Sequence, residues 1–209
     1  MDVRRLLIVS LCLFGLAAPR IRAQHPAPHK LICFGDSITA GYGLAPGHSY
    51  PDALQRQLKS LNLNYTVLNR GTSGATTKDA VASLPEVLRL HPDVVVVEFG
   101  GNDGLRGLPL TQTRDNLDRV VSALTAAHIR VLVAGITLPP NYGPDYVEQF
   151  DAIFPALARK YHTALVPMIY KDLVGVPGTI QADGIHPTSK GSEIIAGTLL
   201  PALKPLLTR

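Results

Sequence analysis

Five short runs of apolar, mostly β-branched residues alternate with longer segments of helical spacing along this 209-residue sequence. Because strands that alternate with helices form right-handed βαβ units, the alternation predicts an α/β fold with a five-stranded parallel sheet covered on both faces. The clearest strand is Val94-Val95-Val96-Val97, since a parallel strand buried on both faces needs no polar alternation. The predicted strands are 30–34, 65–68, 94–99, 129–136 and 164–166, and the predicted helices are 50–61, 78–90, 113–127, 146–161 and 189–203.

The amino terminus differs from the rest of the chain. Arg4 and Arg5 precede a mostly apolar run at 6–18, which is followed by a short segment ending at Ala23. This layout predicts a secretory signal peptide at 1–23, an exposed leader at 24–29 and a single domain at 30–209. The alternative is an uncleaved anchor, but the run is shorter than the ~20 residues of a transmembrane helix. We therefore expect a periplasmic or extracellular protein with no stable membrane anchor after cleavage.

Charge and cysteine content narrow the class of protein further. The whole chain has a net charge of +4, but removal of residues 1–23 takes away four Arg and one Asp and leaves a charge of about +1. No cluster of Lys and Arg in the remaining sequence could follow a phosphate backbone, so we expect no nucleic-acid partner. Cys12 lies in the apolar run, and Cys33 lies in a predicted strand, where a buried hydrophobe is favoured over a catalytic thiol. We expect a monomer, although no motif bears on the oligomeric state.

Glycines and small polar residues follow the first three predicted strands. The segments are Gly35-Asp36-Ser37-Ile38-Thr39, Asn69-Arg70-Gly71-Thr72-Ser73-Gly74 and Gly100-Gly101-Asn102-Asp103, and a fourth, Asp183-Gly184-Ile185-His186-Pro187, precedes the last helix. Parallel α/β sheets bind ligands outside the carboxyl ends of their strands. These four segments therefore predict a functional site at one edge of the sheet.

The residue types in these segments suit nucleophilic catalysis. A serine hydroxyl needs a neighbouring base, and a histidine base is better oriented when a carboxylate holds its other ring nitrogen. The spacing of Asp183 and His186 on a turn fits this pairing, and Ser37 is the predicted nucleophile. Ser73 is a second candidate, but the sequence around it misses the G-x-S-x-G pattern by one position.

Three donors could stabilise the oxyanion formed when an acyl carbon is attacked. They are the backbone N–H groups of Ser37 and Gly74 and the side-chain amide of Asn102. Each element also has a purely structural interpretation: Ser37 could cap a helix, Asn102 could hold a turn, and Asp183 with His186 could form a surface ion pair or two metal ligands. We predict no metal site, because no third ligand motif accompanies Asp183 and His186.

These residues together resemble a known family. Gly35-Asp36-Ser37, Gly74, Gly100-Gly101-Asn102-Asp103 and Asp183-x-x-His186 resemble, in order, the four blocks of the SGNH (GDSL) hydrolases, and the resemblance covers residues 30–205. Segments 98–107 and 138–143 are similar to a subgroup of bacterial periplasmic acyl-CoA thioesterases, lysophospholipases and arylesterases. The resemblance implies a flavodoxin-like three-layer α/β/α fold, the catalytic roles given above, and neither a metal nor an organic cofactor.

The subgroup also implies where an acyl chain binds. Its members bind the acyl chain with the loop after the third block, which is 104–110 here, so the predicted substrate-binding residues are Leu105, Leu108, Leu110 and Tyr142. Covering the core would explain the three leucines equally well. Thr137 stands where relatives often carry a basic residue, which leaves the handling of negatively charged substrate groups open.

The predicted function is hydrolysis of acyl esters or thioesters of small or lipid-like substrates through a Ser-His-Asp triad and an acyl-enzyme intermediate. Two alternatives remain. The first is a carbohydrate O-deacetylase, since related folds remove acetyl groups from glycans, and the second is a non-catalytic binding protein that retains the fold.

Overall fold

The computed structural model describes residues 27–207, so the predicted signal peptide and the first part of the predicted leader lie outside the described residues. Five parallel strands form one sheet in the order β2-β1-β3-β4-β5, which is the flavodoxin-like order. The strands are β1 (His29–Gly35), β2 (Tyr65–Gly71), β3 (Val94–Glu98), β4 (Arg130–Ala134) and β5 (Ala164–Val166). The predicted fold class is confirmed, and each observed strand overlaps a predicted one.

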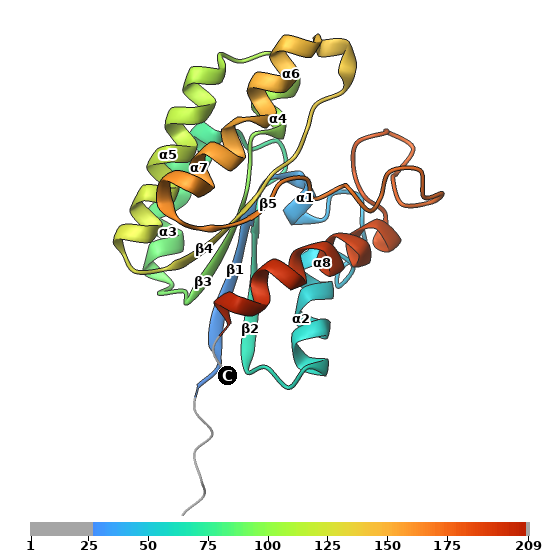
Figure 1. Cartoon of the computed structure of the whole chain (residues 1–209). Helices are drawn as coiled ribbons and strands as arrows, with labels where there is room; N and C mark the ends of the chain where they lie inside the picture. Colours follow the sequence, from blue (N-terminus) through green and yellow to red (C-terminus); the bar gives the residue numbers. More distant parts are fainter. Residues whose placement is uncertain (1–26, 208–209) are drawn as a thin grey trace, which may run out of the picture.

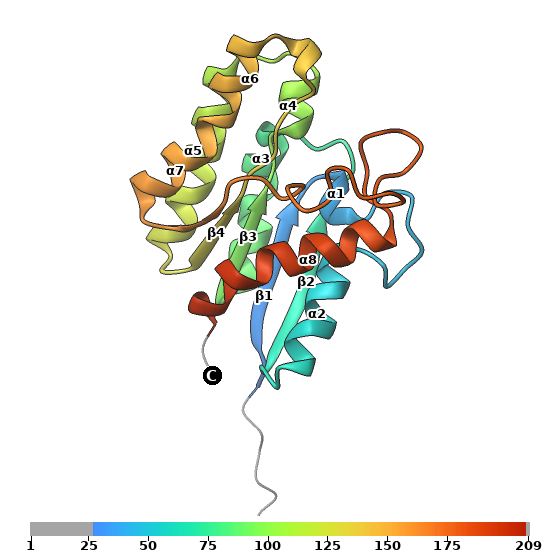
Figure 2. The same cartoon turned by 45° about the vertical axis from the view of Figure 1, so that its right-hand side comes forward.

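Helices cover both faces of the sheet and complete three layers (Figures 1 and 2). One face carries α2 (Tyr50–Ser60) and α8 (Ser189–Leu203), which pack against each other. The other carries α3 (Thr77–Arg89), α5 (Leu110–Ala126) and α7 (Ile153–Tyr161). The shorter elements are α1 (Ser37–Ala40), α4 (Gly101–Leu105), α6 (Pro144–Asp151) and the 3₁₀ turns η1 (Pro140–Tyr142) and η2 (Lys204–Leu206).

The core follows from the central position of β1 and β3. Both strands have a neighbour on each side and helices on each face, so Leu31, Ile32 and Val94–Val97 are almost fully buried. Leu54 from α2 and Leu124 from α5 close the core from opposite faces. Because these two strands are held rigidly, the residues that follow them have well-fixed positions.

Local side-chain chemistry fixes where the long helices begin. Ser49 and Asp52 form a capping box at the start of α2, and such boxes satisfy N–H groups that lack partners within the helix. The Thr188 side chain accepts a hydrogen bond from the Gly191 N–H at 3.2 Å and so caps α8. The N-cap of α8 thereby lies two residues beyond His186.

The predicted helix at 146–161 is wrong in one respect, because two helices, α6 and α7, meet at Ala152. The cause is Pro155, which has no N–H to donate to the carbonyl four residues earlier and so interrupts the helical ladder. The helices α1 and α4 were not predicted, because four or five residues are too few to show helical periodicity.

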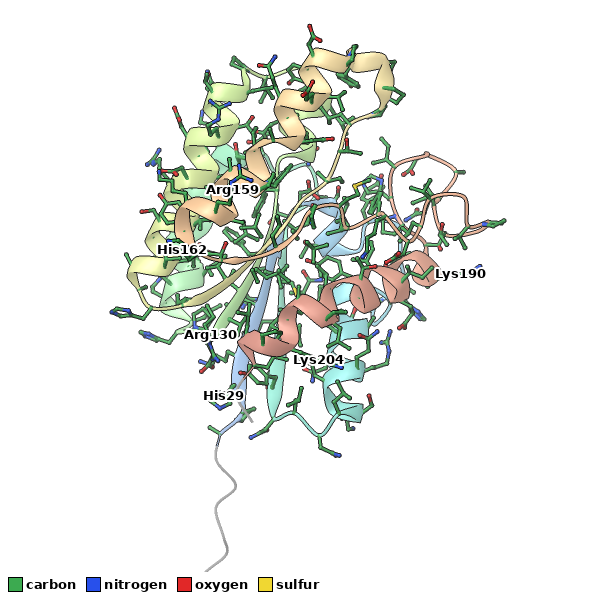
Figure 3. The ribbon with its side chains drawn as sticks, viewed as in Figure 1. His29, Arg130, Arg159, His162, Lys190 and Lys204 are labelled. Atoms are coloured by element: carbon green, nitrogen blue, oxygen red, sulfur yellow. The ribbon has the colours of Figure 1, made fainter. Side chains whose placement is uncertain are left out.

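Basic side chains are dispersed over the outer surface. Figure 3 shows labelled side chains at the periphery that come from different elements, among them His29 on β1, Arg130 on β4 and Lys190 on α8. His29 and Arg130 both approach Asp93, at 2.8 and 3.8 Å. Within residues 27–207, no helix is long and apolar enough to cross a membrane.

Candidate active site

A cavity of about 200 Å³ opens at the carboxyl end of the sheet. Residues that follow β1, β2, β3 and β4 meet there with residues of the segment 167–188, which connects β5 to α8. All four segments predicted to form the site contribute to its wall. The lining residues are Asp36, Ser37, Ile38, Tyr42, Ser73, Gly74, Gly101, Asn102, Leu105, Ile136, Ile185 and His186.

Ser37 is the first residue of α1 and lies directly after β1. The Asp36 side chain caps this short helix by accepting a hydrogen bond from the Ile38 N–H at 3.0 Å. The helix rests against the end of β2, where a Cβ on Gly71 would lie 2.1 Å from the Ala40 nitrogen. Glycine at 71 therefore lets α1 approach the sheet closely, and this contact fixes the position of Ser37.

A chain of hydrogen bonds links Ser37 to His186 and Asp183. Nε2 of His186 lies 2.8 Å from Oγ of Ser37, and Nδ1 of His186 lies 2.7 Å from Oδ2 of Asp183. Oδ1 of Asp183 accepts from the backbone N–H groups of Ile185 and His186, at 2.9 and 3.0 Å. The hydrogen bond from the His186 ring, helped by those two N–H groups, lowers the pKa of Asp183 to about 2, so this side chain is an ionised acceptor at neutral pH.

The segment that carries His186 forms neither a helix nor a strand and is held in place by individual hydrogen bonds. The Gln181 N–H donates to the His186 carbonyl at 2.8 Å, and the Gln181 side chain donates to the Tyr42 carbonyl at 2.7 Å. The Tyr170 hydroxyl donates to the Ile185 carbonyl at 2.9 Å. The ring of Tyr42 lies against the imidazole, with 4.6 Å between centroids. These contacts restrict how far the imidazole can move away from Ser37.

The three predicted oxyanion donors line the same cavity. Gly74 has a φ of +79°, a left-handed conformation that a side chain would strain. Nδ2 of Asn102 lies 3.1 Å from Oδ2 of Asp36 and 3.0 Å from the Ala75 carbonyl oxygen. Both amide hydrogens of Asn102 therefore have acceptors in this structure.

Two buried carboxyl groups lie close to Ser37. Burial raises the pKa of Asp36 to about 6. Burial and the charge of Asp36 raise the pKa of Glu98, the last residue of β3, well above its usual range. A pair of interacting buried carboxyl groups is expected to hold one proton over a wide pH range.

Of the four residues predicted to bind an acyl chain, Leu105 lines the cavity and the other three do not. The chain leaves α4 through Gly107, whose φ is +61°. Leu110 begins α5 and packs against the core. The Tyr142 hydroxyl donates to the Leu105 carbonyl at 2.7 Å, so Tyr142 supports a lining residue without forming the wall itself.

Several lining residues had no predicted role. Tyr42, Ile136 and Ile185 supply much of the apolar wall. Tyr42 stands between two glycines, Gly41 and Gly43, which was the available signal that this turn approaches the site. The contribution of Ile136 depends on where β4 ends, and periodicity does not resolve that point.

The structural alternatives fit this geometry less well. Ser73 lines the cavity, but the His186 ring bonds to Ser37. Asp183 and His186 bond to each other, and within residues 27–207 no group of three His, Cys, Asp or Glu side chains could hold a metal ion. The arrangement is thus a serine hydroxyl, an imidazole and a carboxylate joined by hydrogen bonds at the ligand-binding edge of a parallel sheet, an arrangement typical of serine hydrolases.

Comparison with known proteins identifies the family. The model of the GDSL-like lipase/acylhydrolase family matches residues 33–194. The chain is 40% identical to esterase TesA of Pseudomonas aeruginosa, over 95% of this chain and 99% of that protein. It is 37% identical to thioesterase 1/protease 1/lysophospholipase L1 of Escherichia coli K12, over 87% of this chain and 86% of the relative.

The crystal structure of TesA superposes with a TM-score of 0.82 at 41% identity, covering 86% of this chain and all of that one. The chain therefore belongs to the GDSL-like lipase/acylhydrolase family, as the sequence motifs predicted. It is an esterase of this family, a hydrolase of the ester and thioester class.

Proposed function

We propose that this protein is a secreted serine esterase and thioesterase that works through an acyl-enzyme intermediate, with Ser37 as nucleophile, His186 as base and Asp183 as the residue that orients the base. The observation that carries this proposal is the continuous chain of hydrogen bonds from Ser37 Oγ through His186 to Asp183, at 2.8 and 2.7 Å. These distances lie within the range that proton transfer from a nucleophile to its base requires.

In the proposed first half-reaction, Oγ of Ser37 attacks the acyl carbon while Nε2 of His186 accepts the hydroxyl proton. The imidazolium is stabilised by the Asp183 carboxylate. The tetrahedral intermediate then expels the alcohol or thiol, which takes the proton from His186, and the acyl group stays on Ser37. In the second half-reaction a water molecule gives a proton to His186 and attacks the acyl carbon. The tetrahedral intermediate then expels Oγ of Ser37, which takes the proton back from His186, and the acid is released.

The negative oxygen of each tetrahedral intermediate needs donors in the cavity wall. The backbone N–H groups of Ser37 and Gly74 and the amide of Asn102 are our candidates. Asn102 donates to both Asp36 and the Ala75 carbonyl, so the oxyanion must take over one of these bonds. The bond to the neutral Ala75 carbonyl is the weaker, because a hydrogen bond to an ionised acceptor is about twice as strong. We therefore assign that hydrogen of Asn102 to the oxyanion.

The cavity wall suits an apolar acyl group. Leu105, Ile136 and Ile185 present aliphatic side chains beside Ser37, and Tyr42 adds an aromatic face that is 54% exposed. At about 200 Å³ the cavity is smaller than the roughly 300–1,000 Å³ of typical ligand pockets. Short acyl groups should therefore be hydrolysed fastest, and a longer acyl chain would extend past Leu105 or Ile185 towards solvent.

The proposal is tested by hydrolysis of p-nitrophenyl esters from acetyl to palmitoyl, comparing residues 24–209 with the Ser37→Ala variant. We expect the substitution to lower kcat by roughly 10⁶-fold, as the loss of a nucleophile does in other serine hydrolases. Ser73→Ala is the matched control, because it changes another serine in the same wall and should retain activity.

The outcomes separate the candidate functions. Activity that extends beyond acetyl and disappears in Ser37→Ala supports the esterase, whereas strict preference for acetyl would favour the carbohydrate O-deacetylase. Activity that survives in Ser37→Ala, or no activity in wild-type protein together with no reaction of Ser37 with a fluorophosphonate probe, would overturn the assignment.

A further inference from the structure

The carboxyl groups of Asp36 and Glu98 form a buried pair directly behind the proposed nucleophile. Asp36 precedes Ser37 and is 2% exposed, and Glu98 ends the neighbouring strand β3 and is 1% exposed. Their close approach depends on Gly35, where a Cβ would lie 2.7 Å from the Glu98 Oε2 atom and 2.0 Å from the Thr39 hydroxyl. The reaction scheme above gives neither carboxyl group a role, although burying two of them is costly.

Hydrogen bonds distinguish the two groups. Asp36 accepts from the Ile38 N–H at 3.0 Å and from the Asn102 side-chain amide at 3.1 Å, one on each carboxyl oxygen. Two N–H donors on its two oxygens favour an ionised carboxylate. Asp36 thus has the surroundings of an anion, and it holds the amide that we assign to the oxyanion.

The surroundings of Glu98 give less support to a negative charge. Its Oε2 accepts from the Thr39 hydroxyl at 2.8 Å, and Thr39 in turn lies 2.9 Å from the Tyr50 hydroxyl. Its Oε1 is buried and has no direct hydrogen-bond partner among the described residues. A charge on this oxygen would be uncompensated in a medium of low dielectric, whereas a proton there could be directed at Asp36.

The other titratable groups around the pair do not supply a compensating positive charge. Cys33 and Tyr50 are fully buried, and burial raises the pKa of each, which keeps both neutral. The pKa of Tyr170 is raised by burial and then by the charges of Glu98, Asp36 and Asp183. On the side of the cavity, His186 lowers the pKa of Asp36 only to the extent that its imidazole holds a second proton, which it does not do while it acts as the base. Within residues 27–207, no ion pair includes Asp36 or Glu98.

We propose that Glu98 is a neutral, protonated acid in the working enzyme and that its proton supports an ionised Asp36, which acts as a positioning residue for the oxyanion amide of Asn102. This inference rests on the proposed function only for the role of Asn102. The negative charge of Asp36 orients one amide hydrogen of Asn102 and leaves the other, which donates to the Ala75 carbonyl at 3.0 Å, available to the oxyanion. Because Glu98 is neutral, the ionised Asp36 carboxylate has no second negative charge beside it.

The protonation state is tested by infrared spectroscopy, which does not require turnover. At pH 8 the carbonyl-stretch band of a protonated carboxylic acid should be present in wild-type protein and absent from Glu98→Gln. Identical spectra in this region would overturn the proposal. The orientation of Asn102 has its own readout, since the side-chain amide resonances of Asn102, assigned with Asn102→Ala, should shift in Asp36→Asn and stay in place in Glu98→Gln.

Kinetics on the p-nitrophenyl ester test the consequence for catalysis. In Asp36→Asn an NH₂ group must face one of the two N–H donors. We therefore expect kcat to fall by about ten- to a hundredfold, which is less than the roughly 10²–10³-fold loss caused by removing an oxyanion donor. KM should stay within about threefold of the wild-type value. Glu98→Gln preserves a neutral group of the same shape and should keep kcat within about threefold, whereas Glu98→Ala leaves a cavity and should lose stability and activity.

Two kinetic results would contradict the inference in variants shown to be folded by circular dichroism: an unchanged kcat in Asp36→Asn, or a loss of more than about tenfold in Glu98→Gln. If wild-type protein shows no esterase activity and Ser37 does not react with a fluorophosphonate, the proposed function has failed. The infrared and amide measurements still decide whether the neutral acid exists and whether Asp36 orients Asn102.

Discussion

The two halves of the candidate site are held in different ways. Ser37 and Asn102 begin or belong to short helices that directly follow the central strands β1 and β3, and their neighbours are almost fully buried. Asp183 and His186 lie in the segment 167–188, which has no helix or strand beyond one isolated bridge. This segment forms the orange loop that projects beside α1 in Figure 1.

A reactive side chain can thus be positioned either by backbone packing or by hydrogen bonds within a loop. The nucleophile side is fixed by the packing of backbone on backbone, as the contact between Gly71 and Ala40 shows. The base side is fixed by individual hydrogen bonds in a loop whose tip is exposed, with Val174 at 75%. Changes to the backbone packing around Ser37 should therefore alter stability and activity together, whereas in the loop that carries His186 the effects on stability and on activity should be separable.

The largest effect that sharpens this comparison is expected from Asp183→Asn. The imidazole loses the acceptor that fixes its tautomer and stabilises its charge, so kcat should fall by roughly 10⁴-fold. Because the folded-state pKa of Asp183 is lowered to about 2, its stabilising contribution is present above about pH 4 and is lost as the pH falls through about 2. The difference in free energy of unfolding between variant and wild type should thus be small at neutral pH and vanish in strong acid. Denaturant titrations at several pH values and ester hydrolysis measure both quantities.

The second prediction concerns Asn102 on the nucleophile side. Asn102→Ala removes the side-chain donor from the cavity wall and should lower kcat by about 10²–10³-fold with little change in KM. Asn116→Ala is a control, because Asn116 is a partly buried asparagine that donates to Thr77 and does not line the cavity. If both variants retain kcat, Asn102 has no part in binding the oxyanion.

A matched pair of glycines tests the comparison through stability. Gly71→Ala places a Cβ against the backbone of α1, so the free energy of unfolding should fall by about 3 kcal/mol, the upper end of the range for overpacking, and kcat should fall with it. Gly178→Ala lies in the loop with a φ of +74° and open space around it. It should cost about 1 kcal/mol, as left-handed conformation does, and spare kcat. Equal losses of activity in the two variants would remove the distinction between the two halves.

The smallest effect is expected from Tyr170→Phe. This change removes the hydrogen bond to the Ile185 carbonyl, which contributes about 1 kcal/mol, and should lower kcat a few-fold by loosening the loop that holds His186. Amide hydrogen exchange measured by mass spectrometry should show faster exchange confined to peptides from the 167–188 segment. Tyr161→Phe in α7 serves as a control, because Tyr161 does not line the cavity.

The same difference explains which parts of the fold and of the site could be predicted from the sequence. The strands and the edge of the sheet where Ser37 lies were predictable, because they follow from apolar runs and parallel topology. The positions of Asp183 and His186 were predictable as a motif on a turn. The lining role of Tyr42 and the pairing of Asp36 with Glu98 were not, because both depend on which loop reaches over the cavity and on how closely two neighbouring strands end. That Leu108 and Leu110 lie outside the cavity wall was not predictable either, because the path of the loop after α4 cannot be read from apolar residues alone.

Cys33 gives the molecule a natural probe of its own unfolding. The thiol is fully buried in β1, and burial raises its pKa far above the usual range, so in the folded chain it is neither ionised nor accessible to a thiol reagent. A chain that begins after residue 23 has this cysteine as its only one. Its labelling rate therefore measures how often the central strand separates from its neighbours.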